Sequence, residues 1–117
     1  MLIDFNKIEE GKITNFHGGD KEVFFRAYDE QGRRIMKTRM IPGSSNGLHK
    51  HETNSEIIYV ISGEGEAIVD GKKEFLKPGL VTYCPLGSSH EIRNTGKEDL
   101  ICFNVICWRT FYMIMFI

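Results

Sequence analysis

The sequence predicts an all-β fold, a sandwich or barrel of short strands joined by tight turns. Turn-forming glycines recur at intervals of 8, 8, 8 and 9 residues, at Gly63, Gly71, Gly79, Gly87 and Gly96. Such regular spacing is typical of antiparallel sheets. Apolar side chains show no extended helical spacing, so we expect only a short helical turn within residues 1–10.

Two segments predict strands in more detail. Asp70-Gly71 favours a type I′ turn, because both central residues of that turn need a positive φ. This turn would join residues 66–70 to residues 72–76 as a hairpin. The apolar run of residues 57–61 is typical of a strand that is buried on both faces.

Length and charge limit the function classes. A chain of 117 residues has room for one domain and one core, and 41% hydrophobic with 26% charged residues is the balance of a folded globular protein. Lysine and arginine number 15 against 16 aspartates and glutamates. Because this balance supplies no basic excess to neutralise phosphates, nucleic acid is not an expected partner.

The cysteines and the N-terminus indicate a reducing compartment. Cys84, Cys102 and Cys107 are odd in number and include no C-x-x-C pair, which argues against a disulfide framework and against a thiolate zinc site. The opening residues, with Asp4 in a short apolar run, do not form a signal peptide. We therefore expect a cytoplasmic protein.

The C-terminal segment, residues 100–117, allows two interpretations. It is nearly as long and apolar as a membrane span, but Asn104 and Arg109 lie within it. The alternative is a final strand followed by an apolar tail that packs on the barrel or on a second subunit. We expect this alternative and a homodimer, because exposed apolar strands need cover and two-fold dimers are the commonest solution.

Three of the four histidines fall in two places that allow a metal site. His49 and His51 are two residues apart, so in an extended segment both side chains point to one face. Glu56 either stays in water at the mouth of a strand or points inward, where a cation must offset the cost of burying its charge. His90 follows a tight turn, where a single histidine is ordinarily structural. His17, beside two glycines, is expected to be a surface turn residue.

These residues belong to two motifs that closely resemble those of the cupin superfamily. The first motif spans residues 43–63 and the second spans residues 79–94, with 15 residues between them, as in compact single-domain microbial members. Together they cover a little under half of the chain. Every defined position is filled: Gly43, His49, His51, Glu56 and Gly63 in the first motif, and Gly79, Pro85, Gly87, His90 and Asn94 in the second.

The resemblance implies a small antiparallel β-barrel of the jelly-roll type, formed as a single domain over residues 1–117. Asn94 is implied to be a turn residue, and the apolar tail of residues 107–117 departs from the usual cupin ending. The resemblance also implies one divalent transition metal (Mn, Fe, Co, Ni, Cu or Zn), because three imidazoles and one carboxylate suit such an ion better than Ca²⁺ or Mg²⁺. The implied metal ligands are His49, His51, Glu56 and His90.

The resemblance leaves the activity open. Relatives use sites of this type for dioxygen-dependent cleavage, decarboxylation and isomerisation, so we expect a metal-dependent enzyme that acts on a small polar organic molecule. The alternative is a non-catalytic cupin that binds a sugar or an organic acid and keeps the metal for structure.

Residues near the implied site are less well defined by the sequence. By strand alternation, Ile58 shares the face of Glu56 and gives the site an apolar wall. Lys37, Arg39 and Arg26 are candidates to bind a substrate carboxylate, although a solvated strand face is the commoner place for such residues.

Overall fold

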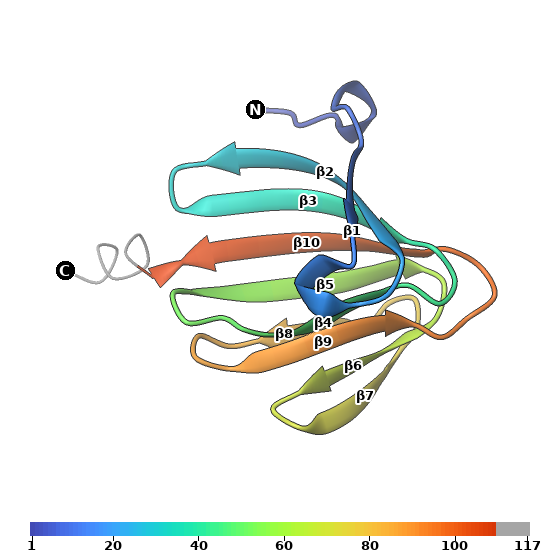
Figure 1. Cartoon of the computed structure of the whole chain (residues 1–117). Coiled ribbons are helices and arrows are strands. Elements are labelled where there is room, and N and C mark those ends of the chain that lie inside the picture. Colours follow the sequence, from blue (N-terminus) through green and yellow to red (C-terminus); the bar gives the residue numbers. More distant parts are fainter. Residues whose placement is uncertain (110–117) are drawn as a thin grey trace.

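The structure, a computed structural model, describes residues 1–109 and confirms the all-β prediction (Figure 1). The strands form two antiparallel sheets that pack face to face, as in a jelly roll. The larger sheet has the strand order β1-β2-β3-β10-β5-β8, and the smaller sheet has the order β4-β9-β6-β7.

The elements of the described chain are short and follow the expected turns. The larger sheet consists of β1 (Gly11–Thr14), β2 (Glu22–Glu30), β3 (Arg33–Met40), β5 (Asn54–Ser62), β8 (Val81–Cys84) and β10 (Leu100–Trp108). The smaller sheet consists of β4 (Ser45–Lys50), β6 (Gly65–Val69), β7 (Lys72–Leu76) and β9 (Ser89–Asn94). Two 3₁₀ turns also form, η1 (Phe5–Lys7) and η2 (Phe16–Gly18), and η1 is the short helical turn expected near the N-terminus.

The hairpin between β6 and β7 forms as predicted. Its turn residues Asp70 and Gly71 have φ angles of 49° and 80°, the two positive values that a type I′ turn requires. The turn brings Val69 opposite Lys72 in the antiparallel ladder.

The prediction that residues 57–61 are buried on both faces is wrong for the single chain. Ile58 and Val60 point into the core, whereas Ile57, Tyr59 and Ile61 lie on the outer face and are between 42% and 46% exposed. The physical reason is the two-layer architecture, in which the smaller sheet covers only the inner face of the larger one.

The C-terminal segment contributes a central strand. β10 lies between β3 and β5 in the larger sheet, so Leu100–Trp108 is paired on both sides (Figure 1). Within residues 1–109, no helix is long and apolar enough to cross a membrane. Of the expected tail, Cys107 and Trp108 end β10, and residues 110–117 lie outside the described residues.

The hydrophobic core lies between the two sheets and leaves one end of the fold open for a site. Leu100, Val60 and Ala67 have no exposed surface, and they bring β10, β5 and β6 together. Ile106, at the other end of β10, instead lines a cavity. The buried core residues are Val23, Met40, Ile58, Val60, Ala67, Leu76, Ile92, Leu100 and Cys102.

The buried side chain of Asn94 organises the turn after β9, which matches its implied role as a turn residue. Its Nδ2 donates to the carbonyl oxygens of Met40 and Glu98, both at 2.8 Å. Its Oδ1 accepts from the backbone N–H of Gly96 at 2.9 Å. One side chain therefore satisfies backbone groups of three different residues.

We expect Asn94→Ala to lower the free energy of unfolding by about 2–4 kcal/mol, because it removes three hydrogen bonds, one of them to the carbonyl oxygen of the buried Met40. Urea denaturation measures this difference. Lys97→Ala, at an exposed position of the same turn, is the control and should stay within about 0.5 kcal/mol of the parent. A loss under about 1 kcal/mol for Asn94→Ala would show that the turn does not depend on this side chain.

Candidate metal centre

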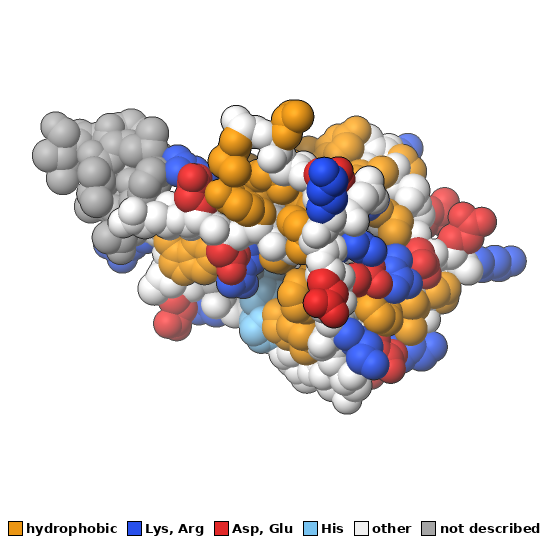
Figure 2. All heavy atoms as spheres, turned by 90° about the horizontal axis from the view of Figure 1, so that it is seen from above, with side chains coloured by type: hydrophobic (Ala, Val, Ile, Leu, Met, Phe, Trp, Pro, Cys, Tyr) orange, Lys and Arg blue, Asp and Glu red, His pale blue; other side chains and the backbone are white. Residues whose placement is uncertain are grey.

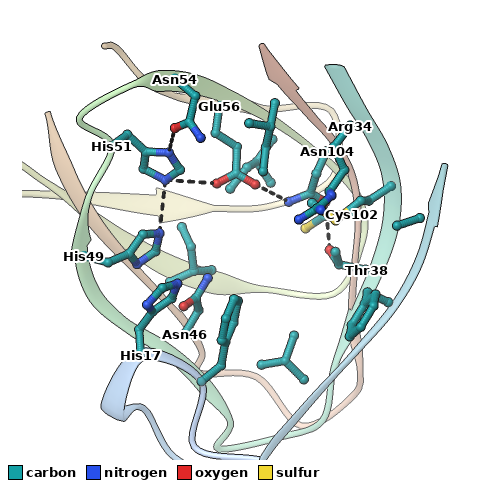
Figure 3. Close-up of a pocket in the computed structure, with 18 of the residues that line it drawn as sticks. His17, Arg34, Thr38, Asn46, His49, His51, Asn54, Glu56, Cys102 and Asn104 are labelled. Carbon is teal, nitrogen blue, oxygen red and sulfur yellow. Dashed lines mark hydrogen bonds and ion pairs between the residues drawn. The ribbon is translucent and has the colours of Figure 1, made fainter. Parts of the chain in front are cut away.

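Four side chains from separate parts of the chain converge on one another. Three of them, His49, His51 and Glu56, line a cavity (Figure 3). His49 on β4 and His90 on β9 are cross-strand partners, and such pairs hold their Cβ atoms about 5 Å apart. His51 follows two residues after His49, and Glu56 points inward from β5. One ligand atom from each of these four residues lies within 4.8 Å of the other three.

The nitrogen atoms at the centre are very close together. The Nε2 atoms of His49 and His51 are 3.0 Å apart, those of His51 and His90 are 2.9 Å apart, and those of His90 and His49 are 3.1 Å apart. Glu56 Oε1 lies 3.4 Å from the Nε2 of His51 and 3.3 Å from that of His90. All four groups therefore face one point.

The outer nitrogens of two rings fix the protonation of the inner ones. His49 Nδ1 lies 2.7 Å from the carbonyl oxygen of Gly47, and His51 Nδ1 contacts the Oδ1 of Asn54. Because both partners only accept, each Nδ1 must carry a proton, and each neutral ring then presents a lone pair at Nε2. Lone pairs and a carboxylate aimed at one point repel one another unless a cation lies between them. The donor set therefore fits a transition-metal ion.

Glu56 and His51 shift each other's pKa values when no cation is present. Burial alone raises the pKa of Glu56, but hydrogen bonds from His51, His90 and Asn104 outweigh this effect and lower the pKa to about 2. The same hydrogen bond to Glu56 raises the pKa of His51. A proton bound at His51 Nε2 would partly neutralise the carboxylate, and a metal ion would displace that proton.

Asn104 holds the carboxylate in place, and the sequence did not assign it this role. Its Nδ2 donates to Glu56 Oε2 at 3.2 Å, and its Oδ1 accepts from the hydroxyl of Thr38 at 2.8 Å. The hydroxyl, the amide and the carboxylate form a chain across β3, β10 and β5 (Figure 3). The only indication in the sequence was that Asn104 is a polar residue at an inward-facing position of an apolar strand.

His17 lies against the centre rather than only on the surface. It belongs to turn η2 and is exposed, as expected, but its ring stacks on that of His49 with centroids 4.0 Å apart and planes 13° apart. The backbone of η2 packs directly on β4, since a Cβ atom on Gly47 would lie 2.2 Å from the carbonyl oxygen of His17. Histidine atoms reach the molecular surface on the face seen in Figure 2, beside apolar side chains.

The three basic residues considered for carboxylate binding lie away from the four-residue centre. Arg39 contacts Glu10 at 2.8 Å and Asp99 at 3.3 Å, and Arg26 donates to backbone carbonyls of the N-terminal segment. Lys37 is exposed and pairs with Arg26 in the strand register, on the face opposite to the cavity. Their positions correspond to the solvated strand face that is common for such residues.

The centre lines a cavity of about 650 Å³ between the two sheets. The cavity has polar groups near the histidines, including Asn46, Asn54 and Asn104, and apolar side chains from β2, β3 and β10. A site in such a cavity is accessible to a small molecule, unlike a closed structural metal site with four protein ligands and no adjoining space.

Comparison with known families agrees with the fold and the motifs. The family model described as the cupin domain matches residues 36–106, which is more than half of the chain. The chain belongs to the cupin family. In this cupin, the match runs from β3 to β10 and includes all four residues of the centre.

Relatives of this cupin include proteins whose names refer to oxalate. The oxalate-binding protein of Thermotoga maritima is 38% identical over 112 residues, which cover 91% of this chain and 93% of the relative. The crystal structure of a predicted oxalate decarboxylase from Thermotoga maritima has a TM-score of 0.87 at 36% identity and covers 92% of this chain and 99% of that one. KdgF from Halomonas sp. has a TM-score of 0.79 at 17% identity, covers 97% and 99% of the two chains, and shows the fold alone.

We expect acid to destabilise the metal-free protein between pH 6.5 and 4, partly through His49. Burial lowers the pKa of His49 from 6.5 to about 4, so the unfolded chain takes up a proton before the folded chain does. The stability that His49 contributes is complete above pH 6.5 and is lost as the pH falls towards 4. His51, with its raised pKa, acts in the opposite direction.

The measurement is urea denaturation in EDTA at several pH values, for the parent and for His49→Gln. The variant should show a shallower fall in the free energy of unfolding between pH 6.5 and 4, because glutamine does not titrate. Equal slopes for the two proteins would rule out this contribution.

Proposed function

We propose that this cupin is a single domain over residues 1–117 that binds one divalent transition metal and, at that metal, the carboxylate of a small organic acid. The proposed metal ligands are His49, His51, Glu56 and His90. The observation that carries the proposal is the convergence of three imidazole Nε2 atoms and one carboxylate oxygen on one point, where His49, His51 and Glu56 line a cavity.

The charge of the centre favours an anionic ligand. Three neutral imidazoles and one carboxylate contribute −1, so a divalent cation would leave a net charge of +1. Glu56 and His90 are 5% and 1% exposed, and a charge in such a poorly hydrated place attracts an anion more strongly than it would in water. The bound metal would act as a Lewis acid that polarises a carboxylate or carbonyl group.

The remaining residues hold the ligands ready. Asn104 fixes Glu56, and acceptors on Gly47 and Asn54 fix the rings of His49 and His51. Such outer contacts orient metal ligands and raise their affinity. The name of the Thermotoga maritima relative, oxalate-binding protein, supports oxalate as the first acid to test.

A metal-dependent enzyme is the second candidate function. The centre lines an accessible cavity, and catalytic metal sites keep a position open for substrate whereas structural sites are closed. Dioxygen-dependent cleavage, decarboxylation and isomerisation of the bound acid are the reaction types under this proposal.

We expect the purified protein to contain about one transition metal per chain, and the metal-loaded protein to bind oxalate. Elemental analysis measures the metal, and calorimetry measures oxalate binding. Glu56→Gln should weaken metal binding by tenfold or more, because it removes the one anionic ligand. Glu66→Gln, on β6 and away from the cavity, is the matched control and should bind metal like the parent.

The same samples distinguish binding from catalysis. Release of formate and CO₂ from oxalate by the parent but not by His90→Ala would support an enzyme, especially if His90→Ala keeps its melting temperature. If the melting temperature of His90→Ala falls strongly and the parent shows no turnover of oxalate, the metal is structural. Absence of both metal and oxalate binding in the parent would overturn the proposed function.

We also propose a homodimer that forms through the outer face of the larger sheet. Tyr59 lies opposite Val81, and Ile57 lies opposite Tyr83, so these four uncharged side chains are neighbours on the outer face. Val81 and Tyr83 are 56% and 50% exposed, and Phe103 of β10 continues the patch beside Tyr59. Contiguous exposed apolar surface of this kind marks association sites.

We expect light scattering to give twice the chain mass of 13.5 kDa, and Tyr59→Glu to give the single-chain mass, since it would place two buried charges in a two-fold interface. Phe75→Glu, at an exposed aromatic position on β7 outside the patch, is the matched control and should remain dimeric. A parent protein of 13.5 kDa would exclude the dimer.

A further inference from the structure

The cavity is much larger than oxalate. Its volume is about 650 Å³, and a water molecule in the liquid takes about 30 Å³, so the cavity has room for roughly twenty waters. Oxalate has only six non-hydrogen atoms. An oxalate at the metal would therefore leave most of the cavity to water.

The unfilled space extends from the centre towards β3 and β2. Glu56 on β5 is in register with Ile106 on β10, and Ile106 is in register with Arg34 on β3. Neighbouring strands are about 4.8 Å apart, so the wall formed by β3 lies roughly 10 Å from Glu56. Figure 3 shows Arg34 and Thr38 across the cavity from His49 and His51.

Part of the far wall is apolar and incompletely covered. Phe25 and Ala27 on β2 and Met36 on β3 line the cavity, and each is only half-buried although it lies on the inner side of the fold. Apolar surface that remains in contact with cavity water gains free energy when an apolar group replaces that water.

The charged residues of the cavity do not favour a second carboxylate at the far wall. Arg34 Nε lies 2.6 Å from Asp29 Oδ1, and the two side chains form a second contact of 3.2 Å, so this cation is already paired. Lys50 and Glu52 also line the cavity, but they are exposed and opposite in charge. A long dicarboxylate would thus find one cationic centre rather than two.

From these observations we infer that the preferred ligand is a 2-oxo acid with an aromatic or branched aliphatic side chain. Its carboxylate and keto oxygens are placed at the metal, and its apolar body lies against Phe25, Ala27 and Met36. This inference rests on the proposed function, because it needs the metal to anchor the acid. It adds a chemical class of ligand that oxalate does not represent.

Calorimetry on the metal-loaded protein tests the inference with two acids that share one chelating head. Pyruvate and 2-oxo-4-phenylbutanoate differ only by a benzyl group. The phenyl acid should bind at least tenfold more tightly than pyruvate, because its additional carbons replace water along the apolar wall. Oxalate is titrated in parallel, because its affinity measures binding at the metal without any contribution from the apolar wall.

Two substitutions on β2 form a matched pair. Ala27→Phe fills the cavity near its far wall. It should weaken binding of the phenyl acid at least tenfold and change the affinity for oxalate less than twofold. Tyr28→Phe places the same side chain at the next residue, on the opposite face of the strand, and should change neither. If Ala27→Phe fails to fold, Met36→Gln makes the wall polar at similar side-chain volume. This variant should weaken binding of the phenyl acid at least threefold and leave oxalate binding unchanged.

The outcomes separate this inference from the proposed function. Oxalate binding without any preference for the phenyl acid over pyruvate would overturn the inference and leave the metal-bound acid in place. The inference would also be overturned if Ala27→Phe or Met36→Gln weakened the binding of oxalate and of the phenyl acid equally. Failure of the metal-loaded protein to bind oxalate and both 2-oxo acids would overturn the proposed function as well.

Discussion

Electrostatic repulsion among buried lone pairs is the constraint on which the structure of the site depends. His49 and His51 each use Nδ1 to donate outward, so their Nε2 lone pairs meet at one point with the carboxylate of Glu56. In a buried place this arrangement is costly without a positive charge, whether a proton on His51 or a metal ion. The fold holds the arrangement because the strands that supply the residues are paired in a fixed register.

Much of the fold and the residues of the centre followed from the sequence, because both depend on local patterns. Regular turns predicted antiparallel strands, and the Asp70-Gly71 pair specified its own turn through two positive φ angles. Two histidines at alternate positions share a face of any extended segment. The resemblance to cupins then grouped these histidines with Glu56 and His90, which are distant in the chain.

The contacts that the sequence did not reveal depend on pairing between distant strands. Nothing local links Asn104 to Glu56, and their contact depends on the register between β10 and β5. The ring of His17 reaches His49 because two backbones approach closely at Gly47. Likewise, Arg39 was a candidate for binding substrate until its partners Glu10 and Asp99 were known. Long-range register and ion pairing leave little trace in a single sequence.

The alternation of β5 and β10 connects the metal centre to the outer surface. Glu56 and Asn104 point inward to the centre, while Tyr59 and Phe103 on the same two strands point outward and lie opposite each other. A shift of one residue in the pairing of these strands would move the carboxylate into solvent and the aromatic side chains into the cavity. A second copy of the chain packed on the outer face would therefore stabilise the same register that the centre needs. In the proposed dimer, one strand pair would thus couple association of the chain to the geometry of the site.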